Sequence, residues 1–443
     1  MTGPEIEETA GAPQSGMMPL ITRLYPICRS ITGDGVRATL DILGGEIELE
    51  RHEIPSGTDV FDWTIPPEWN IRDAYIADGS GRRLIDFHEH NLHVLNYSTP
   101  IDTVMSRRAL AAHVHTLPQH PDRIPYRTSY YQKRWGFCLT HNQWQGIPDG
   151  DYRVCIDADL KAGALTLGEV LLPGESETEI VFSTHVCHPS MCNDNLSGIA
   201  VLTRLFQWLS RRPRRYSYRA LYVPGTIGSL SWLWLNRDRL DSVLGGLVLT
   251  GLGDPGGLTY KRSQQEDSCI DRLAALALAD GGEDWEQRGF SPFGYDERQY
   301  CAPGFDLAVG RLSRTPFGEY SEYHTSADHL DFVSETQLQG ALRACQRFVE
   351  YLEADRYWVN LSPCGEPQLG KRGLYGALGG SGGPDEFRLA MLWMLNQADG
   401  SRPVSDVARR SGLSMELLAE AAETLAEAGL LAPADAPASE RKQ

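Results

Sequence analysis

Alternation of buried strands and amphipathic helices from about residue 162 onward is the feature that most limits how this chain can fold. Apolar, strand-like runs such as EIVFSTHVC and YRALYVPG are each followed by a helical pattern, for example SGIAVLTRLFQWLSRR. This order is typical of a largely parallel sheet with helices packed on its faces. Functional side chains in such sheets gather at the carboxyl ends of the strands. We therefore predict an α/β fold with a site at that edge.

The chain is also long enough for more than one domain. Its 443 residues exceed what one core usually accommodates. Residues 58–160 combine Trp, Tyr and turn residues with short alternating runs, which indicates an inserted β-rich domain. The C-terminal helical unit has the element order of a winged helix. The predicted organisation is a disordered tail (1–18), a catalytic domain (19–57 and 161–365), the inserted domain (58–160), a linker (366–383), a winged-helix-like domain (384–434) and a tail (435–443).

Charge and composition argue against several classes of function. The formal net charge of −18 repels nucleic-acid backbones and anionic membrane surfaces. The helix at the recognition position of the C-terminal unit, SMELLAEAAETLAEAG, has no Lys or Arg, which favours packing or homo-oligomerisation over DNA binding. No apolar run is long enough for a membrane helix, and nine cysteines without a regular spacing indicate reduced thiols. We expect a cytoplasmic protein without nucleic-acid or membrane partners.

The segment STHVCHPSMCNDNLSG, residues 183–198, carries the strongest chemical signal. It follows a buried strand and precedes an apolar helix, so its imidazole and carboxylate side chains emerge at the same edge of the sheet. His188 and Asp194 are the predicted metal ligands. His185 is an alternative imidazole, but it lies within the strand pattern and is assigned a supporting role.

Two later segments add ligands of the same kind. The strand pattern GGLVLTGLG ends in Asp254, again at a carboxyl tip. The segment EYSEYHTSADHLDF offers His324, whose second ring nitrogen could be oriented by Asp328 or Glu322. The predicted metal site is therefore formed by His188, Asp194, Asp254 and His324.

These motifs resemble those of the co-catalytic zinc aminopeptidases, a clan that includes glutaminyl cyclases. The resemblance rests on DNLSG from Asp194, on Asp254 and on YHTSAD from Tyr323. It implies that Asp194 bridges two metal ions, that the preceding His and Asp254 complete the first site, and that His324 serves the second. The whole chain is also similar to a bacterial subgroup of aminopeptidase-like proteins with an inserted β domain and a winged-helix tail, through IPSGT, DWTIPPEWNI, PYRTSYY, WGFCL, CHPSM and YDERQY.

One departure from that pattern affects the chemistry. Aminopeptidases of this clan carry a Glu pair after the next strand, the first acting as general base and the second as a ligand. This chain reads VPGTIGS there, with Gly225 and Thr226. Asp296 or Glu297 in FGYDERQYC is the predicted replacement base, unless the metal alone activates water or hydrolysis has been lost. Without the second Glu, one zinc ion is as compatible with the ligands as two.

The resemblance implies zinc-dependent hydrolysis of a peptide or amide bond. Arg298 is suited to hold a substrate carboxylate through two hydrogen bonds, and Tyr323 is the other substrate-binding candidate. A pocket at strand ends fits a small peptide or aminoacyl metabolite better than a folded protein. The alternative is a non-hydrolytic metal-binding or scaffold protein, or a cyclase-like or transferase-like enzyme, on the same fold.

Overall fold

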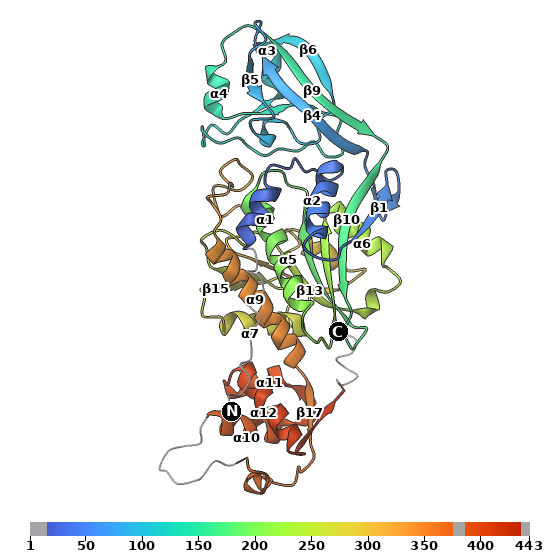
Figure 1. The fold of residues 1–443 in the computed structure, drawn as a ribbon, viewed down its shortest axis with the longest axis vertical. Helices are drawn as coiled ribbons and strands as arrows, with labels where there is room; N and C mark the ends of the chain where they lie inside the picture. The colour runs from blue at the N-terminus through green and yellow to red at the C-terminus, as the bar shows by residue number, and fades with distance from the viewer. Residues whose placement is uncertain (1–15, 375–385, 436–443) are drawn as a thin grey trace, which may run out of the picture.

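The protein is elongated in the computed structural model, which describes residues 16–374 and 386–435 (Figure 1). Three parts follow one another along the long axis: the inserted β-rich domain, a central α/β body, and a small C-terminal domain of helices and short strands. Strands β9 (Asp151–Lys161) and β10 (Ala164–Leu172) run in succession from the inserted domain into the body. Within the described ranges, no helix has the length and apolar character needed to cross a membrane.

The central body is built on an eight-stranded sheet in the order β1-β10-β12-β11-β13-β16-β14-β15. The strand pairs among the four middle strands are parallel, whereas β10 pairs antiparallel with β1 and β12, and β14 pairs antiparallel with β16. The predicted α/β fold is confirmed, with its parallel arrangement concentrated in the middle of the sheet. Besides β10, the strands of this sheet are β1 (Glu50–Pro55), β11 (Glu179–His185), β12 (Ser217–Val223), β13 (Val243–Leu249), β14 (Leu258–Lys261), β15 (Trp285–Arg288) and β16 (Ala308–Ser313).

Both faces of this sheet are covered, because every residue of β11 and β12 is buried. Successive side chains of a strand point to opposite faces, so Ile180 and Phe182 join one core while Val181 joins the other. The first core also contains residues of five helices of the body, and the second contains residues of two helices and of the inserted domain. The first set is α1 (Met17–Leu24), α2 (Asp34–Gly44), α5 (Gly198–Leu209), α7 (Cys269–Ala279) and α9 (Glu335–Ala354), and the second is α6 (Ile227–Leu235) and α8 (Glu297–Tyr300).

The inserted domain has its own antiparallel four-stranded sheet in the order β5-β4-β9-β6. Buried and exposed residues alternate along β9, as expected for a strand with one face on a core. Two short strand pairs, two short α-helices and two single-turn 3₁₀ helices complete the domain. Its elements are β2 (Asp59–Val60), β3 (Trp63–Thr64), β4 (Glu68–Ala77), β5 (Arg83–Asp86), β6 (Ile101–Ser106), α3 (Arg107–Leu110), β7 (Val114–His115), β8 (Phe137–Cys138) and α4 (His141–Gly146).

The C-terminal domain begins earlier than its sequence pattern predicts. Strand β17 (Tyr357–Asn360), expected within the catalytic domain, lies between β18 (Asp399–Pro403) and β19 (Leu431–Ala434) in a three-stranded antiparallel sheet. The pairing was missed because the partners of β17 lie far along the chain. Helix α12, at the recognition position, packs on α9 of the central body. The helices are α10 (Glu386–Gln397), α11 (Val404–Ser411) and α12 (Met415–Glu427).

The sequence predicted a disordered tail at residues 1–18, a linker at 366–383 and a second tail at 435–443. Helix α1 begins at Met17, inside the expected tail, because Met17, Leu20 and Leu24 pack into the first core. Residues 1–15 of that tail, residues 375–383 of the predicted linker (366–383), the two residues that follow it and residues 436–443 lie outside the described residues.

Candidate metal centre

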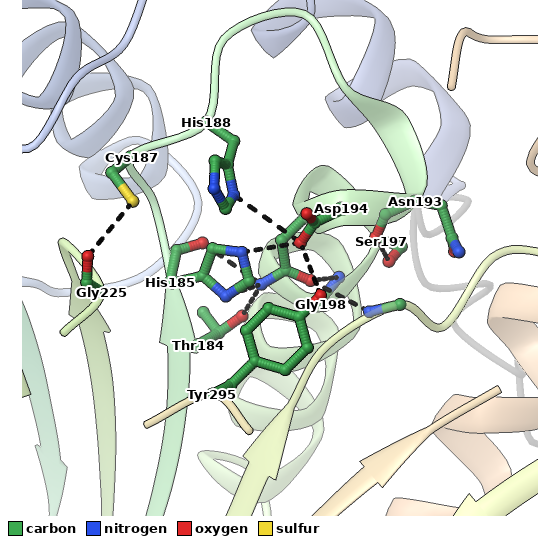
Figure 2. A network of polar contacts seen from close by, with 12 residues as sticks. Thr184, His185, Cys187, His188, Asn193, Asp194, Ser197, Gly198, Gly225 and Tyr295 are labelled. Atoms are coloured by element: carbon green, nitrogen blue, oxygen red, sulfur yellow. Dashed lines mark hydrogen bonds and ion pairs between the residues drawn. The ribbon is translucent and has the colours of Figure 1, made fainter. Parts of the chain in front are cut away.

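The segment 183–198 leaves the sheet at the carboxyl end of β11, passes through an irregular turn at residues 192–197 and enters α5 (Figure 2). The first residue of α5, Gly198, has no room for a side chain. A Cβ there would lie 2.6 Å from the backbone oxygen of Leu249 and 2.5 Å from Oδ1 of Asn195. Glycine therefore lets the turn approach β13 closely, which places Asp194 in the interior at the mouth of the sheet.

Three imidazole rings surround the Asp194 carboxylate (Figure 2 shows His185 and His188). Nε2 of His185 lies 2.9 Å from Oδ1, and Nδ1 of His188 lies 3.6 Å from the same oxygen. Nε2 of His324 lies 3.0 Å from Oδ2. The ligand atoms of His185, His188 and Asp194 all lie within 4.8 Å of one another. His185, expected inside the strand, is its last residue and contacts the carboxylate directly.

Several polar atoms of this cluster are buried without hydrogen bonds. Nδ1 of His188, Oδ2 of Asp194 and Nε2 of His324 have no hydrogen-bond partner among the described residues. Buried polar atoms in folded proteins are normally paired, so three unpaired ones in a single cluster indicate a binding role. Imidazole nitrogen and carboxylate oxygen are ligands that zinc prefers. The residues present therefore fit a zinc ion.

The protonation states in this cluster also suit a metal. Burial lowers the pKa of His188 well below its usual value, which keeps the imidazole neutral. Burial raises the pKa of Asp194, but the close approach of the His188, His185 and His324 rings outweighs this effect and holds the pKa well below its usual value. Neutral imidazole and ionised carboxylate are the forms that bind a metal ion.

The tautomer of His185 follows from its neighbour Asn195. Oδ1 of Asn195 accepts hydrogen bonds from the backbone N–H groups of Gly198 and Gly251, which fixes the orientation of the amide. Nδ2 of Asn195 then lies 3.2 Å from Nδ1 of His185 and donates to it. His185 consequently carries its proton on Nε2 and donates to Oδ1 of Asp194. In this arrangement His185 orients the carboxylate.

The two acids expected to orient His324 lie elsewhere. Oδ1 of Asp328 accepts a 2.6 Å hydrogen bond from the backbone N–H of Asn193, and Oδ2 accepts a 2.8 Å bond from that of Asp194. Asp328 therefore fixes the turn that carries Asp194 rather than the His324 ring. Glu322 contacts Arg123 of the inserted domain at 3.3 Å.

The fourth predicted ligand, Asp254, is buried but is engaged in hydrogen bonds. Its Oδ1 accepts from Oγ1 of Thr315 at 2.6 Å and from the backbone N–H of Gly256 at 2.9 Å. Its Oδ2 accepts from Nδ2 of Asn193 at 3.0 Å. In the described part of the chain, Asp254 does not belong to the compact ligand group around Asp194. Its role as a ligand stays a prediction.

The position of the missing glutamate is adjacent to another acid. A Cβ built on Gly225 would lie 3.4 Å from both carboxylate oxygens of Asp296. Asp296 is only 1% exposed, its Oδ1 accepts a 3.1 Å hydrogen bond from Oγ of Ser229, and its Oδ2 has no partner among the described residues. Burial raises the pKa of Asp296 to about 6, although nearby His185 and the Ser229 hydrogen bond act in the opposite direction.

The next two residues, Glu297 and Arg298, have surroundings that differ from those of Asp296. Glu297 is fully buried, and its Oε1 lies 2.8 Å from Nζ of Lys261 and 3.9 Å from Nη1 of Arg311. This ion pair indicates a structural role for Glu297. Arg298 follows on the short helix α8 and is half-buried. Glu297 is thus held by Lys261, whereas Asp296 lies against Gly225 at the candidate site.

A cavity of about 330 Å³ opens beside Asp194 and its three imidazoles. Its lining includes His185, His188, His324 and Asp296. Tyr295 stacks on the His185 ring at 5.0 Å and donates a 3.3 Å hydrogen bond to Oδ1 of Asp194 (Figure 2). The predicted substrate-binding residue Tyr323 also lines the cavity and stacks on His324 at 3.9 Å. Sequence reasoning missed the other three residues of the aromatic wall that Tyr323 belongs to, namely Phe293, Tyr295 and Phe317.

The fold around this site is that of zinc aminopeptidases. The zinc aminopeptidase BSAP from Bacillus subtilis is similar to this chain with a TM-score of 0.57 at 11% identity, over 76% of this chain and 94% of that chain. A peptidase M28 precursor from Shewanella amazonensis gives a TM-score of 0.53 at 11% identity, over 76% and 92%. At such low identity the likeness concerns the fold alone. The predicted zinc aminopeptidase-like fold is thus confirmed.

Closer relatives define the family. Residues 18–355 match a family described as a domain of unknown function, DUF4910, and the chain belongs to this family. Residues 356–433 match a winged helix-turn-helix family, which confirms the predicted winged helix. A Clostridium acetobutylicum protein, named as a proposed polysaccharide biosynthesis protein with an aminopeptidase-like domain, is 46% identical over 412 residues, covering 93% of this chain and 95% of that protein. The crystal structure of a proposed peptidase from C. acetobutylicum has a TM-score of 0.89 at 45% identity, over 94% and 96%.

Proposed function

We propose that this chain is a zinc-dependent hydrolase of amide bonds in small substrates, and that His188, Asp194 and His324 hold a single zinc ion. The observation that carries the proposal is that each of these three residues has a buried ligand atom without a hydrogen-bond partner among the described residues. Three protein ligands would leave one position of a tetrahedral zinc ion for substrate or water. Zinc bound there would polarise the amide carbonyl and lower the pKa of a water molecule. His185 would hold the Asp194 carboxylate in place by its hydrogen bond to Oδ1.

Asp296 is the group that we assign as general base. Its carboxylate lies next to Gly225, lines the same cavity as the imidazoles and has one oxygen without a partner among the described residues. In the reaction, Asp296 would accept a proton from the attacking water and deliver it to the leaving nitrogen. Such transfer by a positioned side chain contributes about 10²–10⁴-fold to a rate.

The size and lining of the cavity guide the choice of substrate. About 330 Å³ accommodates a small molecule, and the aromatic wall offers an apolar surface for a side chain or a ring. Small peptides and aminoacyl metabolites fit this description. Because the C. acetobutylicum relative is named for polysaccharide biosynthesis, N-acyl amino sugars form the second class to test. Arg298 stays a candidate for binding a substrate carboxylate, and homo-oligomerisation through the C-terminal domain stays a prediction.

A zinc and turnover assay tests the proposal. The full-length protein, stripped with chelator and reloaded with zinc, is expected to bind one zinc ion and to hydrolyse at least one member of a panel of dipeptides, aminoacyl amides and N-acyl amino sugars. His188→Ala is the matched control and is expected to lose both properties. Turnover that persists in His188→Ala would contradict the proposed centre, and two zinc ions per chain would contradict the single site.

A rescue experiment tests the assignment of Asp296. Asp296→Ala is expected to lose activity while zinc content stays at the parent value. Introducing Gly225→Glu into that variant places a new carboxylate beside the vacated space, since the Cβ of residue 225 would lie 3.4 Å from the Asp296 oxygens. Partial recovery of activity in the double variant is expected. If Asp296→Ala is fully active, another group supplies the base.

A non-hydrolytic binding protein is the second candidate, and the observation in its favour is Gly225 in place of the usual base. Calorimetry with the same panel separates the two functions. Zinc-dependent binding of a panel member without turnover, combined with unchanged binding in Asp296→Asn, would favour the binding protein over the hydrolase.

A further inference from the structure

The inserted domain contacts the loop that carries His324. The backbone N–H of Tyr126 donates a 2.7 Å hydrogen bond to the carbonyl of His324, and the N–H of Ser326 donates a 2.9 Å bond to the carbonyl of Ile124. Pro125 and Thr325 form the bridge pair between these two bonds. Residues 124–126 therefore lie antiparallel to residues 324–326 as a short piece of sheet between domains.

Polar contacts of Arg123 extend this connection beyond the two backbone hydrogen bonds. Nη1 of Arg123 donates to the carbonyl of Ser321 at 2.5 Å, and Nη2 lies 3.3 Å from Oε1 of Glu322. His324 has a φ of +54°, in the left-handed region that non-glycine residues rarely adopt. Such a conformation persists only where surrounding contacts hold it, and the inserted domain provides several of them.

The inserted domain also contacts the loop that carries His188. Nδ2 of Asn91 donates a 2.7 Å hydrogen bond to Oγ of Ser190, two residues beyond His188. Nδ2 of Asn96 donates to the carbonyl of Arg29, whose own Nε donates a 2.8 Å bond to the carbonyl of His188. Both loops with a proposed histidine ligand are thus fixed from the same domain.

The side chain of Tyr126 packs against both of these histidines. Its ring is perpendicular to that of His188, with centroids 5.1 Å apart, and perpendicular to that of His324, with centroids 5.0 Å apart. The ring is 5% exposed, and its hydroxyl lies 3.0 Å from that of Tyr130. Perpendicular aromatic pairs at this separation are favourable and directional, so Tyr126 limits rotation of both imidazoles.

We infer that the inserted domain is part of the metal centre, and that Tyr126 is a positioning residue that holds the His188 and His324 rings for zinc. This inference rests on the proposed zinc site, but not on hydrolysis or on the identity of the substrate. Metal affinity depends on how well the ligands are oriented before the ion arrives, and loss of an orienting group typically weakens binding about 10–100-fold. The inserted domain then acts as a clamp on two ligand loops that belong to the central body.

Zinc affinity of the apoprotein, measured by competition with a chromophoric chelator, tests the clamp. Tyr126→Ala is expected to bind zinc about 10–100-fold more weakly than the parent. Tyr126→Phe keeps the ring and is expected to bind within about twofold of the parent, because the perpendicular contacts need no hydroxyl. Tyr152→Ala removes another buried tyrosine of the inserted domain, one that donates to Pro148, and is expected to leave zinc affinity unchanged.

The absorption spectrum of the Co²⁺-loaded protein supplies a readout of ligand geometry. Tyr126→Ala is expected to change the position or intensity of the ligand-field bands, whereas Tyr126→Phe restores the parent spectrum. If Tyr126→Ala does not fold, Arg123→Ala loosens the same loop from its outer side and is expected to weaken zinc binding severalfold. Parent-like zinc affinity in both Tyr126→Ala and Arg123→Ala would overturn the inference. A parent that binds zinc tightly but hydrolyses nothing contradicts only the proposed hydrolase.

Discussion

Two buried clusters of charged residues on the same sheet differ in how completely their polar atoms are paired. On β12, Arg219 is 1% exposed and forms ion pairs with Glu169 on β10 and with Glu179 on β11, where Nε lies 2.6 Å from Oε2. The second oxygen of Glu169 accepts a 2.8 Å hydrogen bond from Nε1 of Trp232. In the cluster around Asp194 at the other end of β11, by contrast, candidate ligand atoms on three residues and one oxygen of Asp296 have no hydrogen-bond partner among the described residues.

This difference distinguishes buried charges that stabilise the fold from buried charges that serve a function. Burying a charge costs free energy unless hydrogen bonds and opposite charges compensate for it. The Arg219 cluster meets this requirement within the protein, and it ties three neighbouring strands together. The cluster around Asp194 leaves several of its polar atoms without hydrogen bonds among the described residues, which is the arrangement expected of a site that binds a ligand. Removing members of each cluster should therefore affect different properties.

The largest expected effect is on catalysis. Asp296→Asn is expected to lower kcat by about 10²–10⁴-fold, because an amide cannot accept the proton, while zinc affinity changes little. Glu297→Gln is the matched control: it neutralises the adjacent acid but disrupts the ion pair with Lys261, so it should lower thermal stability more than kcat. Steady-state kinetics on the zinc-loaded proteins measures both. The reverse result would assign the base to Glu297.

The next effect is on stability. Arg219→Met removes the buried cation shared by Glu169 and Glu179, of which Glu179 keeps only the partly exposed Arg239, and is expected to lower the free energy of unfolding by about 3–5 kcal/mol. Zinc affinity of the folded protein should stay at the parent value, since the clusters share no residue. Urea unfolding followed by circular dichroism measures the loss, and Arg219→Met combined with Glu169→Gln and Glu179→Gln should recover part of it. A loss of zinc binding in the single variant would show that the clusters are coupled.

Zinc itself should stabilise the protein through the second cluster alone. At a free zinc concentration of about 100 times Kd, the free energy of unfolding is expected to rise by about 2.7 kcal/mol. The same increment is expected in Arg219→Met, because independent sites contribute additively. His188→Ala is expected to show no increment. Thermal or urea unfolding with and without zinc provides the comparison, and equal stabilisation of His188→Ala would indicate zinc binding elsewhere.

The smallest effect is expected at His185. His185→Ala removes the hydrogen bond to Oδ1 of Asp194 and is expected to weaken zinc binding about 10–100-fold, because the carboxylate loses its orientation. His185→Gln keeps a donor and should lie between the parent and His185→Ala. Chelator competition measures all three. If His185→Ala loses zinc as completely as His188→Ala, then His185 is itself a ligand.

Local patterns predicted most of the fold. Strands β11 and β12 and helix α5 appear where alternating burial and helical periodicity indicated them. The pairing of β17 with β18 and β19 was missed, since hydrogen bonds between distant segments leave no local signature. The helical start at Met17 was missed for a similar reason, because its stability comes from packing on the central body.

For the site, the sequence showed which residue types lie at the edge of the sheet. It did not show how each side chain is oriented. His188, Asp194 and His324 come together as predicted, whereas the carboxylate of Asp254 is engaged by Thr315 and Asn193. Asp296 and Glu297 are adjacent in sequence, and only the folded structure shows that Lys261 pairs with Glu297. Side-chain partners of this kind depend on distances between strands, which sequence spacing does not contain.

By itself, the sequence determined the α/β architecture, the winged helix and the presence of imidazoles and carboxylates at the ends of successive strands, because periodicity and composition are local properties. Only the tertiary structure decided which of these polar atoms are left unpaired, that Asp296 lies where Gly225 has no side chain, and that Tyr126 of the inserted domain contacts two ligands of the central body. These features arise where segments from distant parts of the chain meet. Because the segments are buried, the gain or loss of each polar contact changes the free energy of the protein.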